Sequence, residues 1–279
     1  MPVVAPTTLD GVLDALAADP AAHLLAGGTD LMVEVNFGHR RPPAVIALRG
    51  VSSLRAWARD GDVLVLGAGL TYADFQSPEL AAALPALAQA ARTVGSPQIR
   101  NAGTLGGNVA TASPAGDTLP VLVALDASIA LASRAGTRVV PWREFFTGPK
   151  RTSRRPDEVI TALRVPVIES RQEYLKVGTR NAMVISVAGV CVCVDFTGST
   201  VRCGLGSVGP VPLRASAAEE WVTQHIDWTA RSVPDPRTYE TFGTMVAEAA
   251  RPIDDHRSTA EYRRHAIGVL AQRGLMRVL

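Results

Sequence analysis

Residues 95–117 have turn-forming composition throughout, and no persistent helical or strand periodicity describes them. Their last fifteen residues, 103–117, are GTLGGNVATASPAGD. Four of these fifteen residues are glycine, and Asp117 is their only charged side chain. The apolar, helix-forming run TLPVLVALDASIAL follows at once, which argues against disorder. Long loops inside a compact domain are usually functional. We therefore predict an ordered functional loop, built mainly from bare backbone.

A second glycine segment, AGGTDL, occupies residues 26–31. Glycine lets a ligand approach the backbone without meeting a Cβ, so that successive N–H groups can converge on an anion. Neither segment matches G-x-x-x-x-G-K-[ST], and neither is a G-x-G-x-x-G that opens a helix, which excludes P-loop and Rossmann sites. Either Gly-Gly alone is equally compatible with a tight turn that binds nothing. Together the two segments predict a dinucleotide whose pyrophosphate both loops hold through their amides.

Polar side chains in the second segment fit the same ligand. Thr104, Asn108, Thr111 and Ser113 supply hydroxyl or amide groups. Asp117 is a natural acceptor for ribose or ribityl hydroxyls. These residues extend the expected site from the pyrophosphate to a neighbouring sugar.

Composition limits the other ligands. The 279 residues are 47% hydrophobic, enough for one large or two modest domains, and 28 basic against 26 acidic residues give a net charge of only +2. The basic runs GHRR and KRTSRR are short and lack interleaved aromatic residues, so we expect solvated turns and no nucleic-acid binding. No stretch reaches the roughly 20 apolar residues of a membrane span, and the opening lacks signal-peptide character. We expect a cytoplasmic protein.

Three cysteines, Cys191, Cys193 and Cys203, lie within apolar alternating segments. An odd number at C-x-C spacing suits neither a disulfide framework nor a closed metal site. We expect buried free thiols and no metal ligand in this chain. An iron–sulfur cluster, which needs four suitable ligands, would have to be carried by another chain.

The order of patterns predicts an α+β protein in two domains. Residues 8–18 have helical periodicity with Thr8 as N-cap, and the first 50 residues read as a small β-α-β unit. Residues 77–93 read as one helix, and 183–211 as a hairpin turning at 197–199. The predicted domains are 1–170, with lobes of about 1–50 and 51–170, and 171–279. Three helices are expected to close the chain, at 217–225, 239–251 and 259–275.

Six segments in chain order resemble a known family. They are LLAGGTDLMV, IRNAGTLGGNVATASPAGDTLPVL, RRPDEVITALRVP, YLKVGTRNAM, SVGPVPLRASAAEE and DDHRSTAEYRRHAIGVL. They look like the motifs of the FAD-binding medium subunit of molybdenum hydroxylases, a group that includes carbon monoxide dehydrogenase and bacterial xanthine dehydrogenase. The resemblance implies a two-lobed PCMH (vanillyl-alcohol-oxidase-type) FAD-binding domain, followed by a CO-dehydrogenase-flavoprotein-like C-terminal α+β domain.

The resemblance also implies roles for individual residues, with FAD bound non-covalently. Thr111 would lie near the flavin end and Asp117 on sugar hydroxyls, whereas Ile160 and Lys176 would contact the adenosine side or the ring environment. Val184 stands where the family commonly has an acid, so the ring environment here is expected to differ. No catalytic side chain is expected. The pyrophosphate and its neighbouring atoms would be bound by Leu25, Ala26, Gly27, Gly28, Thr29, Asp30, Leu31, Thr104, Gly106, Gly107 and Asn108.

The implied function is electron transfer. The FAD would take electrons from iron–sulfur clusters of a partner chain and pass them to an external acceptor, which is NAD, a quinone or dioxygen. The implied partners are a molybdopterin large subunit and a 2Fe-2S small subunit, assembled as a dimer of heterotrimers. Two alternatives remain open: a self-sufficient FAD-dependent oxidase or dehydrogenase with its own small substrate, and a scaffold that has lost the flavin.

Overall fold

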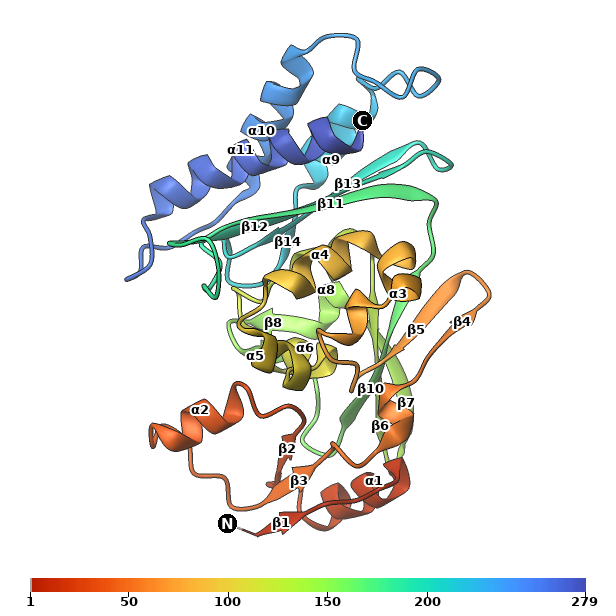
Figure 1. The fold of residues 1–279 in the computed structure, drawn as a ribbon, viewed down its shortest axis with the longest axis vertical. Coiled ribbons are helices and arrows are strands. Elements are labelled where there is room, and N and C mark those ends of the chain that lie inside the picture. The colour runs from red at the N-terminus through yellow and green to blue at the C-terminus, as the bar shows by residue number, and fades with distance from the viewer. Residues whose placement is uncertain (1) are drawn as a thin grey trace.

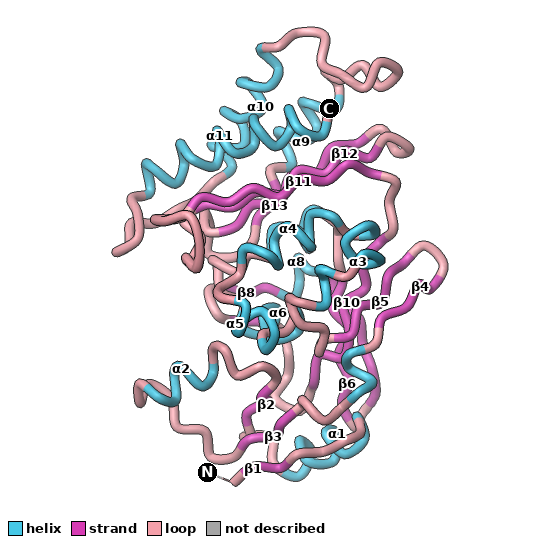
Figure 2. The backbone as a smooth tube through the Cα atoms, viewed as in Figure 1, coloured by secondary structure: helices cyan, strands magenta, loops and turns pink. Residues whose placement is uncertain are grey.

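The computed structural model describes residues 2–279 as three sheet-containing units stacked along the long axis (Figure 1). The N-terminal lobe lies at the bottom of this view, the middle unit at the centre and the C-terminal unit at the top. Helices and strands alternate without a repeat through all three units (Figure 2). The predicted α+β class is confirmed.

The N-terminal lobe holds a parallel sheet in the order β1-β3-β2, formed by Val3–Val4, Val45–Ala47 and His23–Leu25. Helix α1 (Leu9–Ala18) begins where Thr8 Oγ1 accepts from the Gly11 amide, as its sequence predicts. Its apolar stripe packs in a small core that includes Ala132 and Val159 of the middle unit. Helix α2 (Leu31–Asn36) was not expected, and none of its residues is buried.

The middle unit is an antiparallel five-stranded sheet with helices on one side. The strands run in the order β4 (Trp57–Asp60), β5 (Val63–Gly67), β10 (Val159–Pro166), β6 (Ser128–Ser133) and β7 (Gly136–Pro141). A two-stranded sheet, β8 (Phe146–Gly148) and β9 (Arg151–Thr152), lies beside it. The helices are α3 (Pro78–Ala83), α4 (Pro85–Thr93), α5 (Pro97–Ala102), α6 (Leu105–Thr111), α7 (Leu119–Ala124) and α8 (Trp142–Phe145), and short 3-10 turns span Ser52–Arg55 and Asp74–Gln76.

Two expectations for this unit were wrong. The segment beginning at residue 95 is not irregular, because Ser96 caps α5 and Thr104 caps α6, each accepting from the amide three residues on. The helix expected over 77–93 is broken between α3 and α4. Pro85 lacks an N–H and forces Leu84 out of the helical region, at φ −136° and ψ 67°.

The C-terminal unit is an antiparallel sheet in the order β11 (Ser170–Val177), β12 (Ala188–Asp195), β13 (Thr200–Gly206) and β14 (Leu213–Arg214). The predicted hairpin is confirmed, with Val192 opposite Cys203. Helices α10 (Arg237–Ala249) and α11 (Ala260–Val278) cover one face, and α9 (Ser216–Thr223) packs beside β13.

All eight residues of β12 are buried because the sheet is covered on both faces. Val190 and Val192 pack into the core beneath α10 and α11, whereas Cys191 and Cys193 pack into the core of the middle unit. Gly204 lets α7 approach closely, since a Cβ at that position would lie 1.9 Å from the Pro120 carbonyl oxygen. The C-terminal sheet is therefore joined to the middle unit through shared core.

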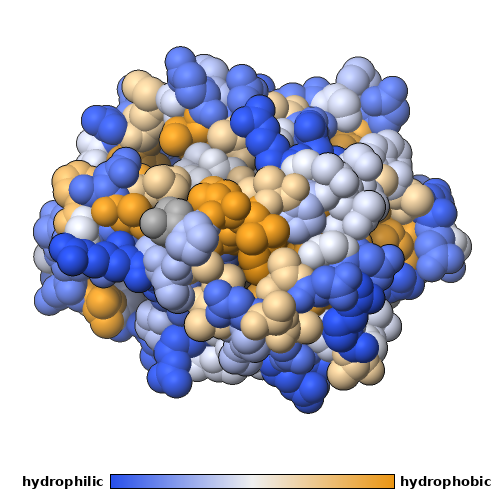
Figure 3. All heavy atoms as spheres, turned by 90° about the horizontal axis from the view of Figure 1, so that it is seen from below, coloured by the Kyte–Doolittle hydropathy of each residue, from blue (hydrophilic) through white to orange (hydrophobic). Residues whose placement is uncertain are grey.

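Figure 3 looks onto the N-terminal end of the molecule, where apolar side chains surface among charged ones. The exposed apolar residues of this lobe include Val3, Val4, Val33 and Phe37. Across residues 2–279, no helix combines the length and the apolarity that a bilayer crossing requires.

The three cysteines are free and fully buried, as predicted. Burial raises the pKa of Cys193 to about 11, and the pKa values of Cys191 and Cys203 are also well above the ordinary value. Because the thiolate is the reactive form, we expect none of them to react with a disulfide reagent at pH 8 in the native protein. All three should titrate in denaturant, and rapid reaction of a native thiol would contradict this packing.

Candidate functional site

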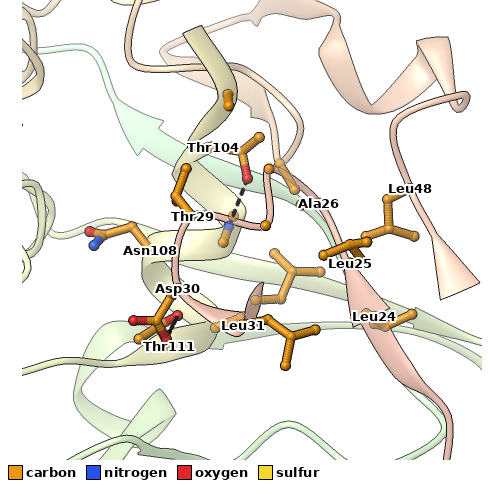
Figure 4. Close-up of a pocket in the computed structure, with 18 of the residues that line it drawn as sticks. Leu24, Leu25, Ala26, Thr29, Asp30, Leu31, Leu48, Thr104, Asn108 and Thr111 are labelled. Carbon is orange, nitrogen blue, oxygen red and sulfur yellow. Dashed lines mark hydrogen bonds between the residues drawn. The ribbon is translucent and has the colours of Figure 1, made fainter. Parts of the chain in front are cut away.

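The two glycine segments meet in space, as Figure 4 shows for Ala26, Thr29 and Thr104. A Cβ on Gly27 would lie 1.9 Å from the Ala102 carbonyl oxygen and 2.9 Å from Gly103 Cα, so only glycine permits this contact. Further along, Thr111 Oγ1 lies 3.4 Å from Asp30 Oδ2. The loops border a cavity of about 850 Å³ that reaches from the N-terminal lobe to the C-terminal unit.

The first loop presents unpaired backbone donors. Within residues 2–279, none of the amides from Ala26 to Leu31 donates to a protein acceptor. Gly28 has φ +71°, which turns the chain at the centre of the run. Successive free amides in such a turn make a concave site for an anion. That these amides hold a pyrophosphate stays a prediction.

The second loop differs from the expectation, because its amides from Leu105 to Asn108 already donate to protein acceptors. Leu105 N donates to Leu70 O and Gly106 N to Ala68 O, both at 2.8 Å, while Gly107 N donates to Thr104 Oγ1 at 3.0 Å. These bonds fix the start of α6 against the end of β5. A run of small residues indicates that another group lies close to the backbone. It does not indicate whether that group is a ligand or another segment of the chain.

The second loop therefore contributes shape and side chains rather than amides. A Cβ on Gly106 would lie 2.5 Å from Ala68 Cβ, so this glycine serves packing. A Cβ on Gly107 would meet only Thr104 Oγ1, at 2.9 Å, and otherwise open space. Asn108 is oriented by Thr118, whose hydroxyl donates to Asn108 Oδ1 at 2.6 Å.

Asp117 lines the cavity within a buried group of polar side chains. Its Oδ2 lies 2.7 Å from Lys176 Nζ, and its Oδ1 accepts from the Tyr174 hydroxyl at 3.0 Å. Burial raises the pKa of Asp117 above its ordinary 3.8, although Lys176 and Tyr174 both favour the carboxylate. Lys176 extends from β11, so this ion pair ties the cavity to the C-terminal unit.

All the residues predicted for the site line the cavity except Lys176, which lies behind Asp117. Ile160 lines it from β10, and Leu25 from the end of β2. Figure 4 places Leu24, Leu25 and Leu48 together on one side, away from Asn108. Val184, singled out from the sequence, also lines the cavity, between the half-exposed Met183 and Ile185.

Charged residues also line the cavity, and Arg40, Lys150 and Arg154 among them come from the basic runs GHRR and KRTSRR, which we expected to be only solvated turns. Arg40, Arg49, Arg55, Lys150 and Arg154 line it together with Asp30, Glu34 and Asp117. Lys150 Nζ lies 2.8 Å from Glu34 Oε1, which joins α2 to the β8–β9 turn and lowers the pKa of Glu34. Excess positive charge suits an anionic ligand. Scattered arginines on separate segments give no spacing from which they could have been predicted.

The fold and the site define a two-lobed protein with a large cavity between its lobes. Two family models cover nearly all of the chain: the FAD binding domain in molybdopterin dehydrogenase matches residues 1–168, and the CO dehydrogenase flavoprotein C-terminal domain matches residues 173–278. The chain therefore belongs to this family of FAD-binding oxidoreductase proteins, and its cofactor is FAD.

Individual relatives agree with this assignment. The chain is 30% identical over 276 residues to the putative xanthine dehydrogenase FAD-binding subunit of Escherichia coli K12, covering 95% of this chain and 91% of that protein. It is 31% identical to the carbon monoxide dehydrogenase medium chain of Hydrogenophaga pseudoflava, with coverage of 91% and 88%. A crystal structure of carbon monoxide dehydrogenase from Oligotropha carboxidovorans matches with a TM-score of 0.90 and 27% identity, covering 100% of this chain and 97% of the matched chain.

The residues present fit FAD. The cofactor needs a cradle for its diphosphate, space for two ring systems and partners for its sugar hydroxyls. The free amides of residues 26–31, the open side of Gly107 and the Asp117 carboxylate meet these needs around one cavity. Across residues 2–279, no group of three His, Cys, Asp or Glu side chains could hold a metal ion.

Replacing Gly27 by alanine tests the contact between the loops. The new Cβ would overlap the Ala102 carbonyl, so the loops must separate. We expect a loss of about 1–3 kcal/mol in the free energy of unfolding and less FAD per protein, measured by thermal melting and flavin absorbance. Gly148→Ala is the matched control, because its Cβ would lie 3.7 Å from the nearest side-chain atom. Equal flavin content in both variants would contradict the contact.

Lys176→Met tests the buried ion pair through its pH dependence. Removing the ammonium raises the pKa of Asp117 further above its value in the unfolded chain. From about pH 4 upward, the native variant then keeps a proton that the unfolded chain has released, so its stability falls as pH rises. We expect a loss of about 3–5 kcal/mol at pH 8 and a smaller one at pH 5, measured by denaturant unfolding.

The double variant Lys176→Met/Asp117→Asn is the control for this prediction. It removes both charges, so it should recover part of the stability and show little of the added pH dependence. A single variant whose loss is the same at pH 5 and pH 8 would show that Asp117 is not held as a buried carboxylate by Lys176.

Proposed function

We propose that this chain is the FAD-carrying electron-transfer subunit of a molybdenum hydroxylase. It would accept electrons from iron–sulfur clusters of a partner chain and deliver them to an external acceptor. The observation that carries the proposal is the run of free amides at residues 26–31, which faces Thr104 and Asn108 across a cavity large enough for a dinucleotide. FAD supplies the redox chemistry, because a flavin can take electrons singly and release them as a pair.

We further propose which groups hold the cofactor. The amides of residues 26–31 would bind the diphosphate, and Gly107 would let it approach α6. Leu25 and Ile160 would pack on the adenosine end, whereas Asp117 would accept from a sugar hydroxyl. Lys176 would act through Asp117 rather than touch FAD.

This chain would bind FAD, orient it and exclude water from part of the cavity. The apolar side chains of Leu24, Leu25 and Leu48 exclude water at one end of the cavity. Asp117 holds a fixed negative charge whose position is set by Lys176 and Tyr174. No side chain is assigned to proton transfer or nucleophilic attack.

The proposed partners are a molybdopterin large subunit and a 2Fe-2S small subunit, in a dimer of heterotrimers. The similarity to the carbon monoxide dehydrogenase medium chain supports this assembly. The acceptor is NAD, a quinone or dioxygen. A cytoplasmic location and a domain boundary near residue 170 stay predictions; the two family matches end at residue 168 and begin at residue 173.

Native purification with metal analysis tests the proposal. An affinity-tagged chain expressed in its own host should elute yellow, with one FAD per chain, two copurifying polypeptides, and molybdenum and iron in the eluate. A yellow protein that purifies alone and turns over a small substrate would instead show the self-sufficient oxidase or dehydrogenase. A colourless protein that takes up no FAD would contradict both functions.

A further inference from the structure

Tyr72 is a buried cavity residue that neither the sequence motifs nor the proposed function uses. It follows β5, is 5% exposed and lines the same cavity as the two loops. Its amide donates to the Gly103 carbonyl at 3.1 Å, and the neighbouring Thr71 forms a bridge with Thr104. The backbone of Tyr72 is therefore fixed to the start of the second loop.

The ring of Tyr72 is also fixed. A Cβ on Gly103 would lie 2.7 Å from Tyr72 Cε2, so the ring rests against the bare Cα of this glycine. Gly103 thus serves to seat an aromatic side chain. With backbone and ring both held, the direction of the hydroxyl is set by the fold rather than by a flexible side chain.

Among residues 2–279, the hydroxyl of Tyr72 has no hydrogen-bond partner. This hydroxyl is not fully enclosed by protein atoms. The contrast with Tyr174 is informative, because that equally buried hydroxyl donates to Asp117. Because the Tyr72 hydroxyl has no protein partner and is not enclosed, it is free to donate to a ligand that fills the cavity.

The charges around Tyr72 define what that partner must be. Burial, and after it the carboxylates of Asp117 and Asp30, hold the pKa of Tyr72 well above its ordinary value of 10. The phenol is therefore a neutral O–H donor at any working pH. Asp117 lines the same cavity and, when ionised, can only accept hydrogen bonds. A ligand hydroxyl between a donor and an acceptor can accept from the phenol and donate to the carboxylate.

The apolar residues away from the leucine-lined end of the cavity suit the flavin half of FAD. Val94, Ile99 and Val184 line the cavity with Tyr72, and the half-exposed Met183 and Ile185 lie at its edge. The isoalloxazine must be reachable by redox partners, so it belongs near the exposed edge rather than at the leucine-lined end. The chain of hydroxyls leading to that ring is the ribityl group.

We infer that Tyr72 contacts the cofactor: its phenol donates a hydrogen bond to a ribityl hydroxyl of FAD, and that same hydroxyl donates to Asp117. This inference rests on the proposed FAD site and adds a residue to it. Tyr72 would fix the flavin half in place, whereas the amides of residues 26–31 hold the diphosphate.

Tyr72→Phe tests this role, because it removes only the hydroxyl. Loss of one neutral hydrogen bond should weaken FAD binding roughly twofold to tenfold. ADP, which lacks the ribityl group and the flavin ring, should bind the variant and the wild type equally well. The measurements are the Kd of FAD for the deflavinated chain, from quenching of flavin fluorescence, and the Kd of ADP, from its competition with FAD.

Tyr262→Phe on the exposed face of α11 is the matched control and should leave both affinities unchanged. Thermal melting without flavin checks that the variants fold alike. Unchanged FAD affinity in Tyr72→Phe, or an equal weakening of FAD and ADP, would overturn the inference while the proposed function stands. A wild-type chain that binds no FAD would overturn the proposed function itself.

Discussion

The contact between Gly27 and the backbone of Ala102 and Gly103 is the constraint on which the site depends. It brings the N-terminal lobe against the helical side of the middle unit, so close that a side chain at residue 27 would overlap the opposite backbone. The first loop is held by this contact and by hydrogen bonds to its carbonyl and carboxylate oxygens, so its own amides stay free. The cavity is the space that remains between the two units.

The two glycine loops are similar in sequence but have different structural roles. One keeps its N–H groups for a ligand, whereas the other uses them to anchor α6 on β5 and offers the ligand an open face and side chains. A third layer, reached through Lys176 and Tyr174 on β11, fixes Asp117 from behind. Diphosphate, sugar and ring would thus each be held by a different unit of the fold.

The sequence predicted the elements whose signals are local. Helix α1 has its period and its cap, the β12–β13 hairpin has its turn, and the α+β class follows from their order. The residues assigned from the family motifs likewise all line the cavity, apart from Lys176. Sequence reasoning missed α5 and α6, where two caps outweigh the turn-forming composition, and it overlooked the break at Pro85. It also missed Tyr72 and the cavity arginines, because their neighbours come from segments far apart in the chain.

The central claim is that residues 26–31, and not 105–108, hold the diphosphate through their amides. Hydrogen exchange of the deflavinated and FAD-loaded chain, read residue by residue, tests it most directly. The account predicts that amides 26–31 exchange rapidly without FAD and become protected with it, while amides 105–108 are protected in both states. Protection that appears with FAD at 105–108 and leaves 26–31 unchanged would contradict it.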